Sequence, residues 1–83
     1  IGDSAVRYAQ QLQQALQDKG YPLLFASPTN QIFPILDREA YHRLSPQVSF
    51  GFWEQLDECH TATRFATSWA TTQEDVQALI DIL

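Results

Sequence analysis

Apolar residues recur at three- and four-residue steps near the beginning of the chain, and glutamines fill many of the positions between them. The apolar positions are Ala5, Val6, Ala9, Leu12, Ala15 and Leu16. This spacing predicts an amphipathic helix over about residues 4–19 that turns one face toward a core. Gly20 follows, and it suits the left-handed position that often ends a helix.

Short apolar runs and turn residues alternate in the next stretch. Residues 23–26 and 31–36 predict two strands, and Pro28 and Asn30 favour a turn between them. Pro34 has no N–H to donate, so we expect the second strand at an edge of the sheet or beside a bulge.

A second helix and two further strands follow. Asp37 can cap a helix over residues 38–44, which a Ser-Pro pair stops. Residues 48–53 and 61–69 have period two and predict strands, with a polar loop over 54–59 between them. In the last strand Thr63, Phe65, Thr67 and Trp69 share one face, and Ala62, Arg64, Ala66 and Ser68 share the other.

The chain ends on a third amphipathic segment. Thr71 with Glu74, or Thr72 with Asp75, forms a capping box that starts a helix. Its apolar stripe is Val76, Leu79, Ile80 and Leu83. The order α-β-β-α-β-β-α predicts an α+β domain, with a small antiparallel sheet and helices packed on one face.

Composition narrows the function classes. Residues 1–83 fit a single domain with a net charge of −5 and 18% charged residues. Nucleic-acid binding needs clustered Lys and Arg, and a membrane span needs a longer apolar run, so we expect neither. Cys59 is the sole cysteine, which favours the reducing cytoplasm. The chain starts at Ile1 and has no methionine, so we interpret it as a piece of a longer protein.

Most residues that could carry chemistry have structural explanations. The three glycines are scattered and form no phosphate-binding loop. Cys59 and His60 are adjacent, so they point apart on an extended chain and predict no metal site. His42 is expected on a solvated helix face. The aromatic residues expected in the core are Phe50, Phe52, Phe65 and Trp69. A cofactor-stacking role for Trp53 or Trp69 is the less favoured interpretation.

Arg64 is the exception. It is the only charged residue of the predicted strand 61–69, and its neighbours on the same face are small. A guanidinium with free space around it can form a bidentate, charge-assisted pair with a carboxylate. The alternative is an arginine that lies on a solvated sheet face or pairs with an acidic neighbour.

The segment from Arg64 to Val76, RFATSWATTQEDV, resembles the end of the threonine aldolase family. These are pyridoxal-phosphate enzymes of fold type I, in which a strand with an arginine precedes a capped last helix. The run Pro28-Thr29-Asn30-Gln31-Ile32-Phe33 is similar to a strand start of that family. The leading helix and Gly20-Tyr21 match its order of elements. The resemblance spans nearly the whole chain, as the family's small C-terminal domain.

The resemblance implies that residues 1–83 close over the active site of a lyase that cleaves β-hydroxy-α-amino acids to glycine and an aldehyde. Arg64 matches the family's arginine for the α-carboxylate of the substrate. Lys19 does not match the lysine that holds the cofactor, so pyridoxal phosphate would be bound mainly by a large domain absent from these residues. The 83 residues alone would then be inactive. The family also implies a homodimer or homotetramer.

Two alternatives remain. The chain could be a stand-alone α+β module that binds a protein or a small ligand, or part of another fold type I enzyme, such as a β-eliminating lyase or an aminotransferase. Within the chain we predict one substrate-binding residue, Arg64, and no catalytic, cofactor-binding or metal-binding residue. We also expect an exposed apolar patch where the rest of the enzyme would cover the domain.

Overall fold

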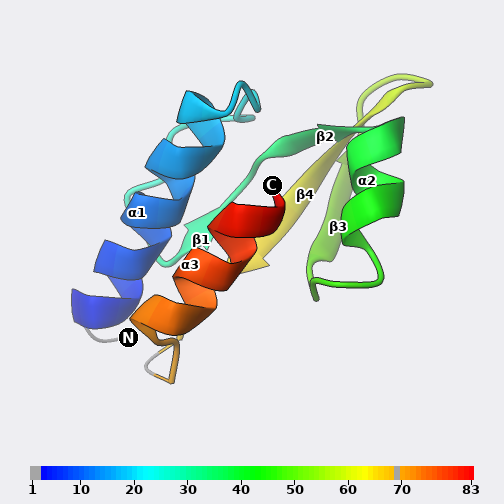
Figure 1. Ribbon diagram of the computed structural model, residues 1–83. Coiled ribbons are helices and arrows are strands. Elements are labelled where there is room, and N and C mark those ends of the chain that lie inside the picture. The colour runs from blue at the N-terminus through cyan, green and yellow to red at the C-terminus, as the bar shows by residue number, and fades with distance from the viewer. Residues whose placement is uncertain (1–2, 69) are drawn as a thin grey trace.

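A computed structural model of the chain describes residues 3–68 and 70–83 (Figure 1). In this part of the chain three helices and four strands follow one another along the sequence. They are α1 (Asp3–Asp18), β1 (Gln31–Ile32), β2 (Ile35–Asp37), α2 (Arg38–Leu44), β3 (Gly51–Gln55), β4 (His60–Ala66) and α3 (Gln73–Ile82). The predicted α+β class with a small antiparallel sheet is confirmed.

The strand β4 lies at the centre of the sheet and pairs antiparallel with the other three strands. Ala62 pairs with Ile35 of β2 and with Glu54 of β3, so β2 and β3 flank β4 on opposite sides. β1 and β2 keep one register with β4 and form a single edge strand that is interrupted at Phe33 and Pro34. The predicted place of Pro34, at an edge or an irregularity, is confirmed.

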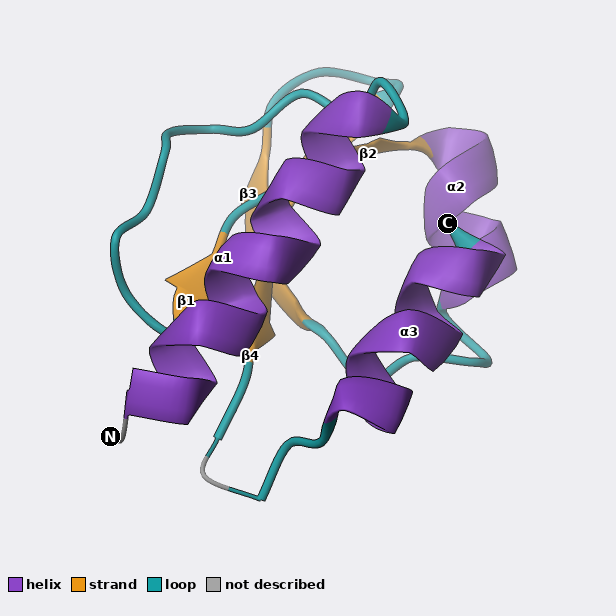
Figure 2. Cartoon of the chain, turned by 60° about the vertical axis from the view of Figure 1, so that its left-hand side comes forward, coloured by secondary structure: helices purple, strands orange, loops and turns teal. Residues whose placement is uncertain are grey.

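The helices cover one face of the sheet, which we call the helix face; Figure 2 shows α1 in front of the strands and α3 beside α1. The core between them contains Ala9, Leu12, Leu16, Ile32, Leu36, Ala40, Leu44, Phe65 and Val76. Burial of such apolar side chains is the main stabilising contribution to a domain of this size. None of the described helices is both long and apolar enough to cross a membrane.

The strand predicted over residues 23–26 is wrong. Only Leu23 pairs, in an isolated bridge with Pro34, and the chain then bends away from the sheet. The reason is a contact with α1: the side chain of Gln13 accepts a hydrogen bond from the Ser27 N–H (3.0 Å) and donates one to the Ser27 carbonyl (3.2 Å). This amide satisfies the buried backbone of Ser27 where a neighbouring strand would otherwise be needed.

The β3–β4 hairpin also departs from the prediction. β3 starts at Gly51 rather than at residue 48 and includes Glu54 and Gln55, which were expected in the loop. The register of the pair shifts between Phe52 and Glu54, where Trp53 forms a bulge. The expectation that Phe52 lies in the core is wrong, because its side chain is 61% exposed. Phe52 lies on the edge strand β3, whereas α2 packs on β2 and β4 and leaves this ring uncovered.

Other predicted elements are confirmed. Phe65 is buried on the helix face, and Phe50 stacks on it with ring centroids 5.1 Å apart. Asp37 caps α2, and Thr72 and Asp75 form the capping box of α3. Gly20 has a φ of 91° and ends α1 as expected. Trp69 lies outside the described residues, so its predicted burial is not addressed.

Candidate functional site

Arg64 lies on the face of the sheet opposite the helices, which we call the open face. Its neighbours along β4, Thr63 and Phe65, are buried on the helix face, whereas Arg64 itself is exposed. Gly51 is its cross-strand partner on β3. The register that β1 and β2 share with β4 puts Phe33 opposite Arg64 on the other side. Arg64 therefore lies between an aromatic residue and a glycine.

The guanidinium of Arg64 makes no hydrogen bond or ion pair with residues 3–68 or 70–83. The arginines Arg38 and Arg43 differ, because Arg38 donates to the Glu58 carbonyl (2.9 Å) and Arg43 bonds Glu39 (3.2 Å). Arg64 thus keeps its donors available for an anion, and its planar fork matches a carboxylate. This observation disfavours the alternative in which an acidic neighbour pairs with Arg64.

Three aromatic rings form a cluster beside Arg64 on the open face. Phe33 lies 4.6 Å from Phe25 and 4.9 Å from Trp53 between ring centroids. Phe33 is nearly buried, but Phe25 is 48% and Trp53 47% exposed. Phe25 and Trp53 are therefore exposed apolar rings on the open face, whereas the exposed ring of Phe52, the cross-strand partner of Thr63, lies on the helix face. Trp53 packs edge-on against Phe33, a side chain of this same chain.

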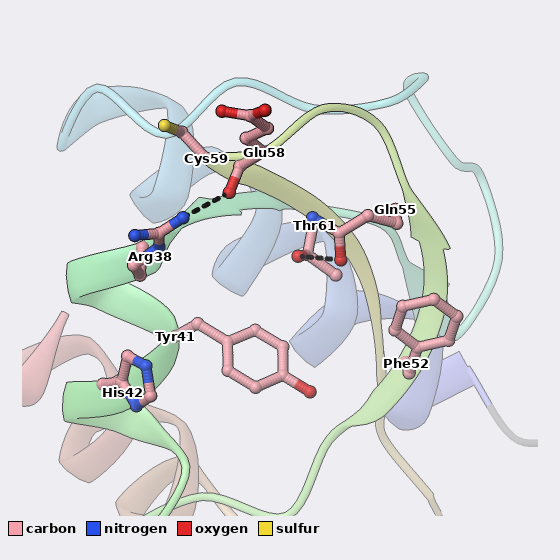
Figure 3. A pocket seen from close by; sticks show the side chains of 8 residues that line it. All are labelled: Arg38, Tyr41, His42, Phe52, Gln55, Glu58, Cys59 and Thr61. Carbon is pink, nitrogen blue, oxygen red and sulfur yellow. Dashed lines mark hydrogen bonds between the residues drawn. The ribbon is translucent and has the colours of Figure 1, made fainter.

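A separate hollow of about 370 Å³ opens between α2 and the β3–β4 hairpin. Figure 3 shows Arg38, Tyr41 and His42 on the α2 side and Phe52 and Gln55 on the β3 side. Within it Thr61 donates to the side chain of Gln55 (3.1 Å), so both polar groups are already satisfied. His42 is exposed, as predicted for a solvated helix face.

The pair Cys59 and His60 lies at the tip of the hairpin and forms no thiol–imidazole site. His60 Nδ1 lies 3.0 Å from Asp57 Oδ1, and the Cys59 N–H donates to the same oxygen (2.7 Å). The Cys59 N–H, and secondarily His60, lower the pKa of the Asp57 carboxyl. Among the described residues, no group of three or more His, Cys, Asp and Glu side chains could hold a metal ion.

No family model matches the chain, and no curated protein matches its sequence. A solved structure does: threonine aldolase from Leishmania major superimposes with a TM-score of 0.89 at 26% identity, over 95% of this chain. The chain resembles a threonine aldolase. This confirms the family resemblance predicted from the sequence, and the α+β fold agrees with it. The match covers 23% of the Leishmania threonine aldolase, so the chain spans about a quarter of that protein's length.

The sequence singled out Arg64 as a candidate but not the residues that surround it. Phe33 and Gly51 become its neighbours only through the pairing of β1, β2 and β3 with β4. One signal was present: Gly51 interrupts an otherwise aromatic strand, and a glycine there often marks a close approach of another group. Phe25 carried no comparable signal, because its run was assigned to a strand.

Proposed function

We propose that the chain is the C-terminal small domain of a pyridoxal-phosphate-dependent lyase resembling threonine aldolase, and that Arg64 binds the α-carboxylate of the amino-acid substrate. The observation that carries this proposal is the unpaired guanidinium of Arg64 on the open face. The likeness to threonine aldolase supports it, because an enzyme of that name acts on an amino acid.

The surroundings of Arg64 favour a carboxylate. Phe33, the cross-strand neighbour of Arg64, belongs to the aromatic cluster with Phe25 and Trp53, and an apolar surface near a guanidinium strengthens a charge-assisted pair with a ligand. Of the residues next to it along the same face, Ala66 is small and exposed, whereas Ala62 is fully buried. A lysine could supply the charge but not the planar, bidentate geometry.

A large domain of the same protein would cover the open face. Half-exposed aromatic rings beside one another are uncommon on an isolated domain and mark a surface that contacts something else. The chain matches only 23% of the threonine aldolase, which leaves ample length for such a domain. Assembly as a homodimer or homotetramer in the cytoplasm belongs to the same proposal.

Pyridoxal phosphate does not fit the residues of this chain. The sole lysine, Lys19, follows the last residue of α1 and lines a hollow with Asp37 and Arg43, not the open face. Gly20 and Gly51 belong to a helix end and a strand, so neither forms a phosphate cradle. The cofactor would therefore be held by the large domain, and the contribution of this chain is to bind and orient the substrate carboxylate.

The test is a kinetic comparison in the full-length protein. It should convert threonine to glycine and acetaldehyde, and Arg64→Ala should lower kcat/KM by about 10–100-fold, since hydrogen bonds to charged groups contribute about 1.5–3 kcal/mol. The absorbance of bound cofactor should stay unchanged. Arg38→Ala is the matched control. It removes an exposed arginine from the hollow between α2 and the β3–β4 hairpin, and should keep wild-type kinetics. Unchanged kinetics in Arg64→Ala would contradict the proposal.

The same assay separates the alternatives. Turnover of β-eliminating substrates or of keto acids, without cleavage of threonine, would identify another fold type I enzyme. A coding sequence that starts at this domain, with no cofactor domain upstream, would favour the stand-alone binding module.

A further inference from the structure

We infer that Gly51 is a positioning residue for Arg64: its missing side chain forms the slot in which the guanidinium lies. This inference rests on the proposed function, because it concerns how Arg64 is presented to the substrate carboxylate. Gly51 and Arg64 are cross-strand partners on the open face of β3 and β4.

The distances support the slot. A Cβ atom built on Gly51 would lie 3.7 Å from both Nε and Nη2 of Arg64 and 3.9 Å from its Cβ. A single methyl group therefore makes ordinary van der Waals contact with the arginine. The γ carbons of a branched side chain extend further, into the space that the guanidinium takes.

The backbone gives no other reason for a glycine at this position. Gly51 is not among the residues with positive φ, so any residue can adopt its conformation. A glycine in a strand also costs stability, because it adds backbone entropy and offers no side chain to pack. Available space beside Arg64 is the remaining advantage of glycine here.

An aromatic residue occupies the other side of Arg64. Phe33 faces Arg64 from the edge strand and is only 6% exposed, because its ring is held between Phe25 and Trp53. A movement of the guanidinium toward Phe33 would bring it against this cluster. A bulky residue at position 51 would therefore push the guanidinium off the sheet and away from its present direction.

The experiment uses the full-length protein and pairs Gly51→Val with Gly51→Ala. We expect Gly51→Val to raise the KM for threonine roughly tenfold with little change in kcat, and Gly51→Ala to raise it less than about threefold. The melting temperature should stay the same or rise, because valine favours strands. Gln31→Val is the control: it places a valine on the open face opposite Ala66 instead of opposite Arg64, and should leave KM unchanged.

A double-mutant cycle shows whether Gly51 acts through Arg64. In the Arg64→Ala background Gly51→Val should have no further effect on KM. An equal rise in KM in both backgrounds, or no rise in either, overturns the inference. If Gly51→Val fails to fold, Gly51→Ser decides the same comparison with a smaller side chain.

The outcomes also separate this inference from the proposed function. If Arg64→Ala raises KM and Gly51→Val does not, the slot is wrong and the role of Arg64 stands. If Arg64→Ala keeps the wild-type KM, or if the wild-type protein cleaves no β-hydroxy-α-amino acid, the proposed function fails and the inference fails with it.

Discussion

The two faces of β4 carry side chains of opposite character. On the helix face Thr63 and Phe65 are buried, and the Thr63 hydroxyl donates to the Pro34 carbonyl (2.8 Å). On the open face Arg64 is exposed and has no partner among the described residues. Both faces belong to the same strand, so this difference in burial follows from the alternation of its side chains.

The polar side chains on the two sides of the sheet also differ in their hydrogen bonds. Buried polar side chains of the helix side, such as Thr63, Thr67 and Gln13, all make hydrogen bonds to the backbone. They therefore hold the fold together and leave nothing for a ligand. The open face has the reverse arrangement, with a free cation beside half-exposed rings. The helix face at Thr63 and Phe65 is covered by the helices of this chain, whereas the open face at Arg64 is suited to a contact with something outside it.

Apolar truncation on the two faces should give the largest difference in stability. Leu16 is fully buried in the core, so Leu16→Ala should lower the free energy of unfolding by about 2–5 kcal/mol. Phe25→Ala on the open face should cost clearly less, because its ring is already 48% exposed. Urea denaturation of both variants measures the difference. Equal losses would mean that the open face is part of the core.

A buried amide provides the second test. In Gln13→Leu the Ser27 N–H loses its acceptor, and the free energy of unfolding should fall by about 1–3 kcal/mol. Gln14 is exposed and bonds only Asp18, so Gln14→Leu should change stability far less. Both variants are compared by urea denaturation. If they behave alike, the Gln13 contact does not fix the segment that leaves the sheet at Ser27.

Substitutions in the N-terminal cap of α3 should change the stability of the domain without changing the KM of the full-length protein. Thr72 accepts a hydrogen bond from the Asp75 N–H (3.1 Å), so Thr72→Ala should cost about 1 kcal/mol, and Thr72→Ser should keep most of the stability. Neither variant should change the KM of the full-length protein, since α3 covers the helix face. Chemical denaturation and steady-state kinetics measure the two effects. A raised KM in Thr72→Ala would show that the two faces are coupled.

The smallest effect is expected from pH at the hairpin tip. The lowered pKa of Asp57 means that its carboxylate stabilises the folded state above the unfolded pKa, and that this stability is lost as pH falls through the folded pKa. Asp57→Asn should therefore lower the melting temperature slightly near neutral pH, and the difference should vanish well below about pH 4. Melting curves over a pH series provide the measurement. A difference that does not depend on pH would exclude the charge as its cause.

The sequence predicted correctly those elements whose ends are determined by neighbouring residues. The helix α2 has its predicted bounds, because Asp37 caps it and a Ser-Pro pair stops it within a few residues. The strand over 23–26 failed because the deciding contact comes from Gln13, on another element. The prediction that Phe52 is buried failed because its exposure depends on which strands α2 covers. The periodicity of a single sequence does not contain that information.

The candidate site shows the same difference between local and long-range determinants. A lone charge among small residues marked Arg64 without any knowledge of the fold. Its neighbours Phe33 and Gly51 depend on the register of three strand pairs, which separate segments of the chain establish only on folding. The role of Arg64 in binding a carboxylate stays a prediction.

The most direct test of that role compares threonine with its amide in the full-length protein. The amide lacks the carboxylate that Arg64 would bind, so the wild-type protein should use threonine with a much lower KM than threonine amide. In Arg64→Ala this preference should disappear, with the KM for the amide unchanged. A preference for the acid that persists in Arg64→Ala would contradict the proposed role of Arg64 and of the open face.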